Sequence, residues 1–468
     1  MKIKQHHKVF RVRELLGEGF LEPKGEHRIY RVTKQRLTTI EAVERLADLA
    51  GVAPSDISLA GLKDRQGVTT QHMSVRHGKT VDLADSNLRI ETIGGSNRPV
   101  TSEVSLGNAF EITVRGLTGE DLEVLRSNVP FVREHGLINY FDEQRFGNVR
   151  HGQGWIARDL MGGETERALK KLLASISPYE DPRSLAFKKA LEKHWGDWVA
   201  CREDAGRYGK HHSVFEHLKR EPQNFGGAFF HVSSRLRLIH LFAWQSHVWN
   251  RAVAAYFTER IPEDERITMS GVEGPLIHHS RSLALEATMK GAFRLPGPGL
   301  SDVVHPDQRT YLEDVLAAQR MVASDFEITG IPGFQLKGED RPLLLIPKHL
   351  RVRPSSRDAL NPSARGMAMV RIRFELPRGT YATLVVRRLF STTRTSPSLR
   401  DDHTRSLRQD RSSGRDRGPY RGGQNRGGTD RGGTDRGGRN RGGQDRGGPR
   451  RAPKPDSSDE RRRRGRGV

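Results

Sequence analysis

From about Ser391 to Val468 the sequence has almost no large apolar side chains. Such a segment cannot bury enough surface to offset the entropy of ordering it, so we expect it to be disordered. Arg-Gly-Gly triplets recur within it every five residues, starting at Arg421, Arg426, Arg431, Arg436, Arg441 and Arg446. Any folded structure must therefore come from roughly the first 390 residues, which is room for two ordinary domains.

The chain carries a formal net charge of +22. From Ser391 onward, 22 Lys and Arg face 10 Asp and Glu, so this tail holds +12 and the preceding residues +10. Such an excess indicates a polyanionic partner, with nucleic acid ahead of an acidic membrane surface. An arginine-glycine tail binds RNA phosphates and base faces with little sequence preference. The alternative for the tail is a solubilising extension.

The single cysteine, Cys201, cannot form an intramolecular disulfide, which is typical of a reducing compartment such as the cytoplasm. The N-terminus is charged and lacks the apolar region of a signal peptide. No apolar run approaches the length of a membrane span. We expect a cytoplasmic protein without a membrane anchor.

Periodicity predicts several elements of the folded part. Thr38 and Glu41 form a capping-box pattern ahead of a helix that ends at Gly51. Apolar residues alternate with polar ones over 110–115 and 370–376, which predicts two half-buried strands. Helical spacing follows in two further segments, 238–256 and 307–326. Strand patterns thus lie at both ends and helical patterns between them, which favours one α+β domain interrupted by an inserted domain.

Residues 60–71 read Ala-Gly-Leu-Lys-Asp-Arg-Gln-Gly-Val-Thr-Thr-Gln and predict a strand, a charged loop and a second strand. Asp64 lies between Lys63 and Arg65, and neighbouring positive charge favours an ionised carboxylate, as a nucleophile or base requires. A plain surface turn would have a similar pattern. Local physics therefore leaves both interpretations open.

Two more segments combine aromatic and polar residues. Residues 138–147 read Ile-Asn-Tyr-Phe-Asp-Glu-Gln-Arg-Phe-Gly, side chains that can stack on a splayed base and bond to its edge, or fill a buried turn. Residues 376–387 read Leu-Pro-Arg-Gly-Thr-Tyr-Ala-Thr-Leu-Val-Val-Arg and predict a strand end, a turn and a helix. Tyr381 could cover a flat ligand or belong to the core.

Together the three segments resemble the signature loops of the TruD family of tRNA pseudouridine synthases. Those loops read Ala/Ser-Gly-x-Lys-Asp before Val-Thr-x-Gln, Asn-Tyr-Phe-Gly-x-Gln-Arg-Phe-Gly, and Leu-Pro-x-Gly-Ser-Phe/Tyr-Ala-Thr. The resemblance runs from about Lys4 to Leu389 and is also carried by Phe10, Val12, Glu14 and the Gly-Asn-Ala-Phe of 107–110.

The resemblance implies an α+β pseudouridine synthase catalytic domain with a mixed, largely antiparallel sheet. Its two parts would be residues 1–151 and 343–390, interrupted by an inserted α/β TRUD domain at 152–342 and followed by the disordered tail at 391–468. The implied activity is that of an isomerase that converts a uridine in the D arm of tRNA, at position 13, to pseudouridine.

The same resemblance implies roles for individual residues. Asp64 would be the catalytic carboxylate, Lys63 its neighbour in the loop and Lys4 the basic group that pairs with it. The residues that match positions holding the target nucleotide or lining the active site are Phe10, Asn139, Phe141 and Tyr381. The sequence departs from the family pattern at four places. His7-Lys8-Val9 replaces Pro-Glu-Asp, Asp142 replaces a glycine, Arg388 replaces a glutamate, and the basic stretch before Gly-Asn-Ala-Phe is reduced over 97–103.

Isomerising uridine breaks the glycosidic bond, turns the uracil and re-joins it through carbon. This needs no redox step and no external energy, so we expect no cofactor. A single carboxylate suffices, as nucleophile or as base, and the sequence leaves both routes open. The target must be flipped out of its stack, which requires flat partners for the extruded base.

Two other function classes need weighing. A non-catalytic RNA-binding protein could use the same basic surface and tail, although the Lys63-Asp64 pair argues for catalysis. A metal-dependent hydrolase would need paired ligands with a companion carboxylate. The histidine doublets at 6–7, 211–212 and 278–279 lack that spacing, so we expect no metal site and predict surface or RNA-facing histidines.

Overall fold

The computed structural model describes residues 1–150, 154–177, 180–272, 274–280, 291–300, 306–328, 331, 336, 338–361, 367–394 and 400–401. These all lie within one compact unit, Met1–Ser413. The Arg-Gly-Gly triplets lie outside the described residues, so the disorder expected there stays a prediction. Among the described residues, no helix has the length and apolar character needed to cross a bilayer.

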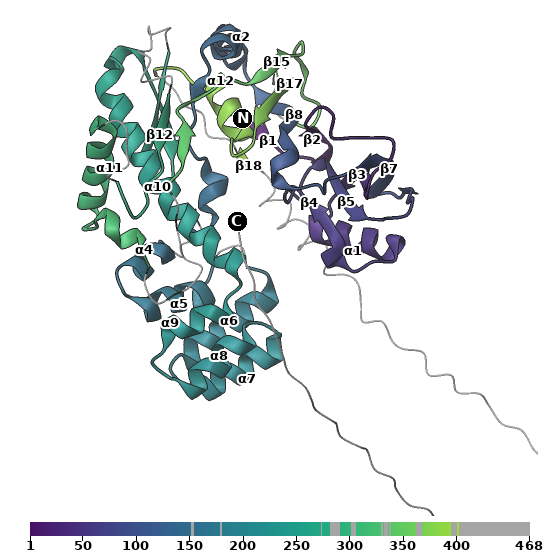
Figure 1. Ribbon diagram of the computed structural model, residues 1–468. Helices are drawn as coiled ribbons and strands as arrows, with labels where there is room; N and C mark the ends of the chain where they lie inside the picture. The colour runs from purple at the N-terminus through teal and green to yellow at the C-terminus, as the bar shows by residue number, and fades with distance from the viewer. Residues whose placement is uncertain are drawn as a thin grey trace, which may run out of the picture. The chain divides into compact units, whose positions relative to one another are not determined.

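A mixed sheet of twelve strands forms the framework of the fold (Figure 1). Its main path runs β15-β17-β8-β2-β5-β3-β7-β6, and every neighbouring pair is antiparallel except β2 with β5. The strands on this path are β2 (Phe10–Leu16), β3 (His27–Gln35), β5 (Val68–Arg76), β6 (Leu83–Ala84), β7 (Leu88–Ser96), β8 (Ser105–Leu117), β15 (Lys348–Val352) and β17 (Ala368–Pro377). The predicted α+β class with a mixed, largely antiparallel sheet is confirmed.

The two strands predicted from alternation pair with each other. In β8 and β17, Ile112 lies opposite Ile372 and Phe110 opposite Phe374. Both isoleucines are fully buried, while Arg373 beside them is exposed. One face of this pair therefore belongs to the core and the other faces solvent.

Helices cover the buried face of the sheet. Helix α1 (Thr39–Ala50) has the predicted capping box, with Thr38 Oγ1 accepting from the Glu41 amide at 3.1 Å. It ends at Gly51, whose φ of 69° is left-handed, so the predicted start and end are both correct. Helices α2 (Gly119–His135) and α12 (Ala382–Leu389) contact each other over the core that contains Ile112.

The segment between β9 and β14 is mainly helical. Its helices are α3 (Gly147–Arg150), α4 (Ile156–Met161), α5 (Thr165–Ala174), α6 (Pro182–His194), α7 (Trp198–Tyr208), α8 (His212–Arg220), α9 (Phe225–Ala228), α10 (Ser234–Arg260) and α11 (Pro306–Ala318). Helices α5 to α9 gather as one helical group (Figure 1). The long α10 buries Trp244 and Trp249 completely. Short strand pairs, β10 (Arg266–Gly271) with β11 (Gly274–His279) and β12 (Ala292–Arg294) with β13 (Asp340–Pro342), complete the segment.

The chain leaves and re-enters the sheet domain at neighbouring points. Strand β9 (Leu137–Ile138) pairs antiparallel with β14 (Leu344–Leu345), and the Asn139 amide donates to the Leu343 carbonyl at 2.8 Å. The segments on either side of the helical part are therefore held together. The predicted domain boundaries at 151/152 and 342/343 stay predictions.

Three expectations from the sequence need correction. The helix expected over 307–326 ends at Ala318, because Arg320 adopts a left-handed φ of 57° and the Met321 amide turns back to the Leu316 carbonyl. Residues 323–326 form a separate 3-10 helix. The disorder expected from about 391 does not hold at Ser391, which is buried, or at β18 (Arg400–Asp401), which pairs in parallel with β1 (Lys2–Ile3).

The third correction concerns the histidine doublet at 278–279. Both side chains are buried in β11, at 0% and 1% exposure, where a surface location was expected. His278 accepts the Ile138 amide on Nδ1 at 3.2 Å. Burial, reinforced by Arg388, holds the pKa of His278 well below its ordinary value, so a neutral ring is part of the packing.

Candidate active site

The loop that carries Asp64 connects β4 (Ile57–Leu59) to β5, as the predicted strand-loop-strand requires. Its last glycine, Gly67, lies against β2, and a Cβ atom there would come within 2.7 Å of the Phe10 carbonyl oxygen. A larger residue would push the loop away from the strand. The loop is thus fixed close to the ring of Phe10.

The carboxylate of Asp64 has two side-chain partners. Oδ2 accepts from Lys4 Nζ at 3.1 Å, and Oδ1 accepts from Gln144 Nε2 at 3.3 Å. The side chain of Asp64 remains 33% exposed whereas Lys4 is only 11% exposed. A carboxylate oxygen therefore stays accessible next to a largely buried cation.

Lys4 is held in an uncommon backbone conformation, with φ at 56°. For a residue with a side chain, this left-handed region costs on the order of 1 kcal/mol or more. Its ammonium also lies 4.4 Å from the centroid of the Phe10 ring, a cation-π contact. Lys4, Phe10 and Asp64 form one cluster, as the resemblance implied.

Lys63 and Arg65 do not contact the Asp64 carboxylate. Lys63 Nζ pairs with Glu14 Oε1 at 2.8 Å, and Arg65 Nε donates to the Arg36 carbonyl at 3.2 Å. The expectation that these sequence neighbours supply the counter-charge is replaced by the ion pair with Lys4. Lys63 instead ties the loop to strand β2.

Glu14, the partner of Lys63, is fully buried. Its Oε2 accepts from the His72 amide at 2.9 Å. Burial alone would raise the pKa of Glu14, but the hydrogen bonds from His72 and the ion pair with Lys63 outweigh it, so this pKa lies below its ordinary value. Glu14 is therefore an anionic anchor beneath the loop.

Lys34 holds the same loop from inside the protein. Its Nζ donates to three carbonyl oxygens, those of Leu37 at 2.9 Å, Lys63 at 3.1 Å and Asp64 at 2.9 Å. The side chain is 1% exposed, and this burial lowers its pKa to about 8 although the charge of Asp64 opposes the shift. The buried amine of Lys34 thus holds two consecutive carbonyl groups of the loop, those of Lys63 and Asp64.

A second cluster forms around Arg341. Its guanidinium donates to Asn139 twice, from Nε to the carbonyl and from Nη2 to Oδ1, both at 2.9 Å. It also lies 3.9 Å from the centroid of the Phe141 ring. Burial lowers the pKa of Arg341 to about 10. No carboxylate in the described part of the chain pairs with it, so its charge is balanced by carbonyl dipoles and a ring face.

Phe141 and Tyr381 approach each other edge to face, with ring centroids 6.2 Å apart and an interplanar angle of 65°. Tyr381 is the residue before α12, the position where the predicted turn passes into the predicted helix. Burial raises the pKa of Tyr381, opposed by the positive charges of Arg145 and Arg341, so its hydroxyl is protonated at neutral pH.

Residues 142–146 link the two clusters. Gln144 reaches Asp64, while the next residue, Arg145, lies 5.7 Å from the Phe141 centroid and donates to Ser246 Oγ at 3.1 Å. The sequence predicted the residue types of this loop. The contact from Gln144 to the Asp64 carboxylate was not predicted.

The departure at Asp142 has a structural counterpart in α12. Asp142 Oδ1 accepts from Arg387 Nη1 at 3.2 Å, and Oδ2 accepts from the Thr383 hydroxyl. Both charged side chains are about 5% exposed. This ion pair fastens the loop that begins after Phe141 to the helix that begins after Tyr381, so it fixes the spacing of the two rings.

Lys34, Glu14 and Arg341 received no role from the sequence, although Lys34 and Glu14 carried a detectable signal. In β3, Tyr30, Val32 and Lys34 occupy the same alternating phase, and Glu14 follows Phe10 and Val12 in the same way. A charged residue in the buried phase of a strand needs a partner. Arg341 has no comparable pattern, because it lies in the three-residue strand β13.

The chain is similar to known proteins over most of its length. A family model described as tRNA pseudouridine synthase D (TruD) matches residues 1–389. A probable tRNA pseudouridine synthase D 1 of Methanococcus maripaludis is 29% identical over 398 residues, covering 84% of this chain and 100% of the relative. A probable tRNA pseudouridine synthase D of Methanopyrus kandleri is 30% identical over 376 residues, covering 78% and 86%.

A solved structure supports the fold. The crystal structure described as a tRNA pseudouridine synthase D of Methanosarcina mazei aligns with a TM-score of 0.60 at 23% identity. The alignment covers 83% of this chain and 93% of the other. The residues after 389 lie beyond the family match.

Proposed function

Because the chain belongs to the tRNA pseudouridine synthase D (TruD) family, we propose that it isomerises a uridine of tRNA to pseudouridine with Asp64 as its catalytic carboxylate. We propose a uridine in the D arm, at position 13, as the target, which is the position that the family resemblance implies. One observation carries the assignment to Asp64: its partly exposed carboxylate is paired with Lys4 at 3.1 Å.

Lys4 and Gln144 suit the task of a reactive carboxylate. A cation within hydrogen-bond distance favours the ionised form, which is the form required of a nucleophile or base. Each partner occupies one oxygen without enclosing it. In the nucleophilic route, an Asp64 oxygen bonds to C1′ as the C1′–N1 bond breaks and uracil leaves with the electron pair.

The uracil then turns, its C5 bonds to C1′, and the carboxylate leaves. The C5 proton is lost and N1 gains a proton, so the product has the atoms of the substrate. In the alternative route, Asp64 removes a sugar proton from C2′ as the C1′–N1 bond breaks and returns it after the new bond forms. Neither route draws on a cofactor.

The second cluster has the surfaces needed to hold a flipped uridine. Phe141 and Tyr381 offer flat apolar faces, and Asn139 is held rigidly by Arg341. Rings packed beside a buried hydrogen-bonded network can retain a free uracil while it turns. We assign Phe10, Asn139, Phe141 and Tyr381 to substrate binding.

The test is Asp64→Asn, which keeps the shape of the side chain and removes its charge. Pseudouridine is read by carbodiimide adducts and primer extension on tRNA incubated with the protein. We expect no product, with tRNA affinity within about threefold of the parent, a difference below 1 kcal/mol. Asp48→Asn, an exposed aspartate of α1, is the matched control and should remain active.

The outcomes separate the possible functions. Turnover by Asp64→Asn would remove Asp64 from catalysis. If the unaltered protein binds tRNA and forms no pseudouridine in any RNA, it is a non-catalytic RNA-binding protein with a synthase fold. A modified uridine outside the D arm would refute the proposed position and leave the chemistry in place.

A further inference from the structure

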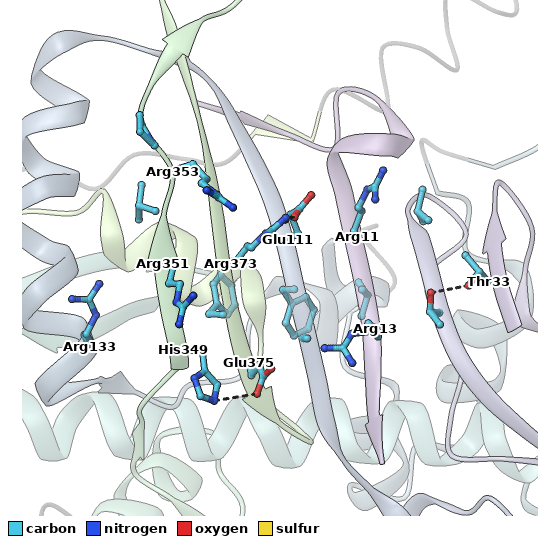
Figure 2. A pocket seen from close by; sticks show the side chains of 18 residues that line it. Arg11, Arg13, Thr33, Glu111, Arg133, His349, Arg351, Arg353, Arg373 and Glu375 are labelled. Carbon is cyan, nitrogen blue, oxygen red and sulfur yellow. Dashed lines mark hydrogen bonds and ion pairs between the residues drawn. The ribbon is translucent and has the colours of Figure 1, made fainter. Parts of the chain in front are cut away.

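A wide hollow lies on the solvent face of the main sheet. It has a volume of about 1020 Å³ and crosses β15, β17, β8, β2 and β5 (Figure 2). Its lining includes six arginines: Arg11, Arg13, Arg133, Arg351, Arg353 and Arg373. Neither Asp64 nor any other residue assigned above to the active site lines it. The two sites share strand β2, which carries Phe10 as well as Arg11 and Arg13.

Strand register explains how the arginines come together. Arg11 on β2 lies opposite Glu111 on β8, which lies opposite Arg373 on β17, which lies opposite Arg351 on β15. Side chains directly opposite each other point to the same face of a sheet. One row of four charged residues therefore runs across four strands.

The neighbouring row is shallow in its centre. Arg13 on β2 lies opposite Ala109 on β8, and Ala109 lies opposite Glu375 on β17. Because Ala109 carries only a methyl group, the row leaves space there between long charged side chains. On the other side of Arg13, Thr70 lies opposite Thr33, and their hydroxyls are 2.9 Å apart.

The acidic residues of the hollow are already engaged. Glu111 pairs with Arg373 and lies 3.8 Å from Arg371. Glu375 lies 3.8 Å from His349 Nε2, as Figure 2 shows. The register of β15 shifts between Lys348 and Arg351, a bulge that turns the ring of His349 toward β17. Six arginines against two glutamates leave the lining with a net charge of +4.

Three of the arginines have no partner. Within the part of the chain that the structure describes, the side chains of Arg13, Arg351 and Arg353 make no hydrogen bond or ion pair, and all three residues are exposed. Arg133 donates only to the Leu350 carbonyl, at 3.0 Å. Unpaired guanidinium groups on a rigid sheet are pre-positioned for oxyanions, which they bind through two parallel hydrogen bonds.

The composition of the hollow selects the kind of partner. The arginine-rich segment after Arg421 has the same sign of charge and would be repelled. The centre of a protein–protein interface is depleted of charged residues, whereas an interface with nucleic acid is polar and strongly positive. A row of arginines across a sheet fits a chain of phosphates.

We propose that this sheet face is a second RNA-contact surface, which binds the sugar-phosphate backbone of the tRNA away from the nucleotide held at Asp64. The proposal rests on the proposed function for its ligand, a tRNA. Contacts to phosphates fix position and orientation without reading sequence. The surface would therefore orient the tRNA body, while the active site selects the uridine.

The experiment compares the full chain with the double variant Arg13→Gln and Arg351→Gln, which removes two unpaired charges. Binding of fluorescently labelled tRNA is measured by anisotropy between 50 and 200 mM salt. Each lost phosphate contact lowers the slope of log affinity against log salt by about 0.7 to 0.9. The affinity ratio between the two salt concentrations should therefore shrink about tenfold in the double variant.

Arg207→Gln is the matched control, because Arg207 on α7 is exposed and has no partner among the described residues. It should leave the salt slope unchanged. An unchanged slope in the double variant, or an equal loss in the control, would overturn the proposal. The proposal would also be overturned if the double variant lost binding to vesicles of anionic lipid but bound tRNA as the unaltered protein does. Binding is measured without turnover, so a protein that makes no pseudouridine would refute the proposed function and leave this result standing.

Discussion

Replacing Lys34 with methionine tests whether one buried amine positions the catalytic loop. Methionine keeps the length of the side chain and removes the donor to the carbonyls of Leu37, Lys63 and Asp64. Two opposing free energies decide the effect on stability. Loss of three hydrogen bonds costs about 1 kcal/mol each, hence about 3 kcal/mol in the free energy of unfolding.

The opposing term is the cost of burying the ammonium. Burial lowers the pKa of Lys34 from 10.5 to about 8, and each unit corresponds to about 1.4 kcal/mol. Removing the charge therefore raises the free energy of unfolding by about 3 kcal/mol at neutral pH. The two terms nearly cancel, so we expect the free energy of unfolding to change by no more than about 1 kcal/mol. The loop nevertheless loses its three tethers.

Activity should respond much more strongly than stability. A displacement of Asp64 by about 1 Å is enough to reduce a rate on the order of 100-fold. Single-turnover pseudouridine formation measures the rate, and denaturant unfolding measures the stability. Lys24→Met, at an exposed lysine, is the control. A full rate in Lys34→Met would refute the positioning role, and a loss of stability of about 3 kcal/mol would refute the cancellation.

The pH dependence gives an independent check. The folded pKa of about 8 lies below the value near 10.4 of an unfolded lysine, so between these pH values the unfolded chain binds more protons. The free energy of unfolding therefore rises with pH across this window. Relative to Lys34→Met, the unaltered protein should gain up to about 3 kcal/mol from pH 8 to 10.4, and nothing below pH 8.

Two further predictions follow from the loop and the tail. Asp142→Asn removes the anionic partner of the buried Arg387, so denaturant unfolding should show a loss of about 3 kcal/mol, with a lower turnover rate as Phe141 and Tyr381 lose their fixed spacing. An unchanged stability would show that the ion pair does not fasten the loop. Deleting residues 402–468 should weaken tRNA binding and flatten its salt dependence while leaving the modified position unchanged, as primer extension would report. A shifted position would contradict this.

Local patterns in the sequence predicted part of the main sheet and of the helices that cover it. The capping box at Thr38 and the alternation around Ile112 and Ile372 depend on neighbouring residues alone, which a sequence displays directly. The end of α11 was predicted too late, because the left-handed turn at Arg320 uses neither glycine nor proline. Strand β18 was not predicted, because it is held by backbone pairing that composition does not report.

The candidate active site likewise combines residues that local motifs indicate with contacts that they do not. The family motifs proposed Asp64, Lys4 and the aromatic residues, whereas the supporting contacts depend on partners far away in the sequence. Lys34 reaches the loop across 30 residues, and Arg341 reaches Asn139 across 202. His278 was expected at the surface, because the sequence does not distinguish a neutral histidine buried in a strand from one that faces solvent.

The pairing of β18 with β1 has a consequence for how substrate is gathered. Asp401 lies beside Ile3, one residue before Lys4, so the chain passes into the 402–468 segment close in sequence register to the lysine that pairs with Asp64. An RNA captured by that segment would meet the active site as a tethered reactant, at an effective concentration on the order of millimolar. Binding of low affinity and low sequence specificity would then be sufficient, because the tether keeps the bound RNA at a high local concentration near the site.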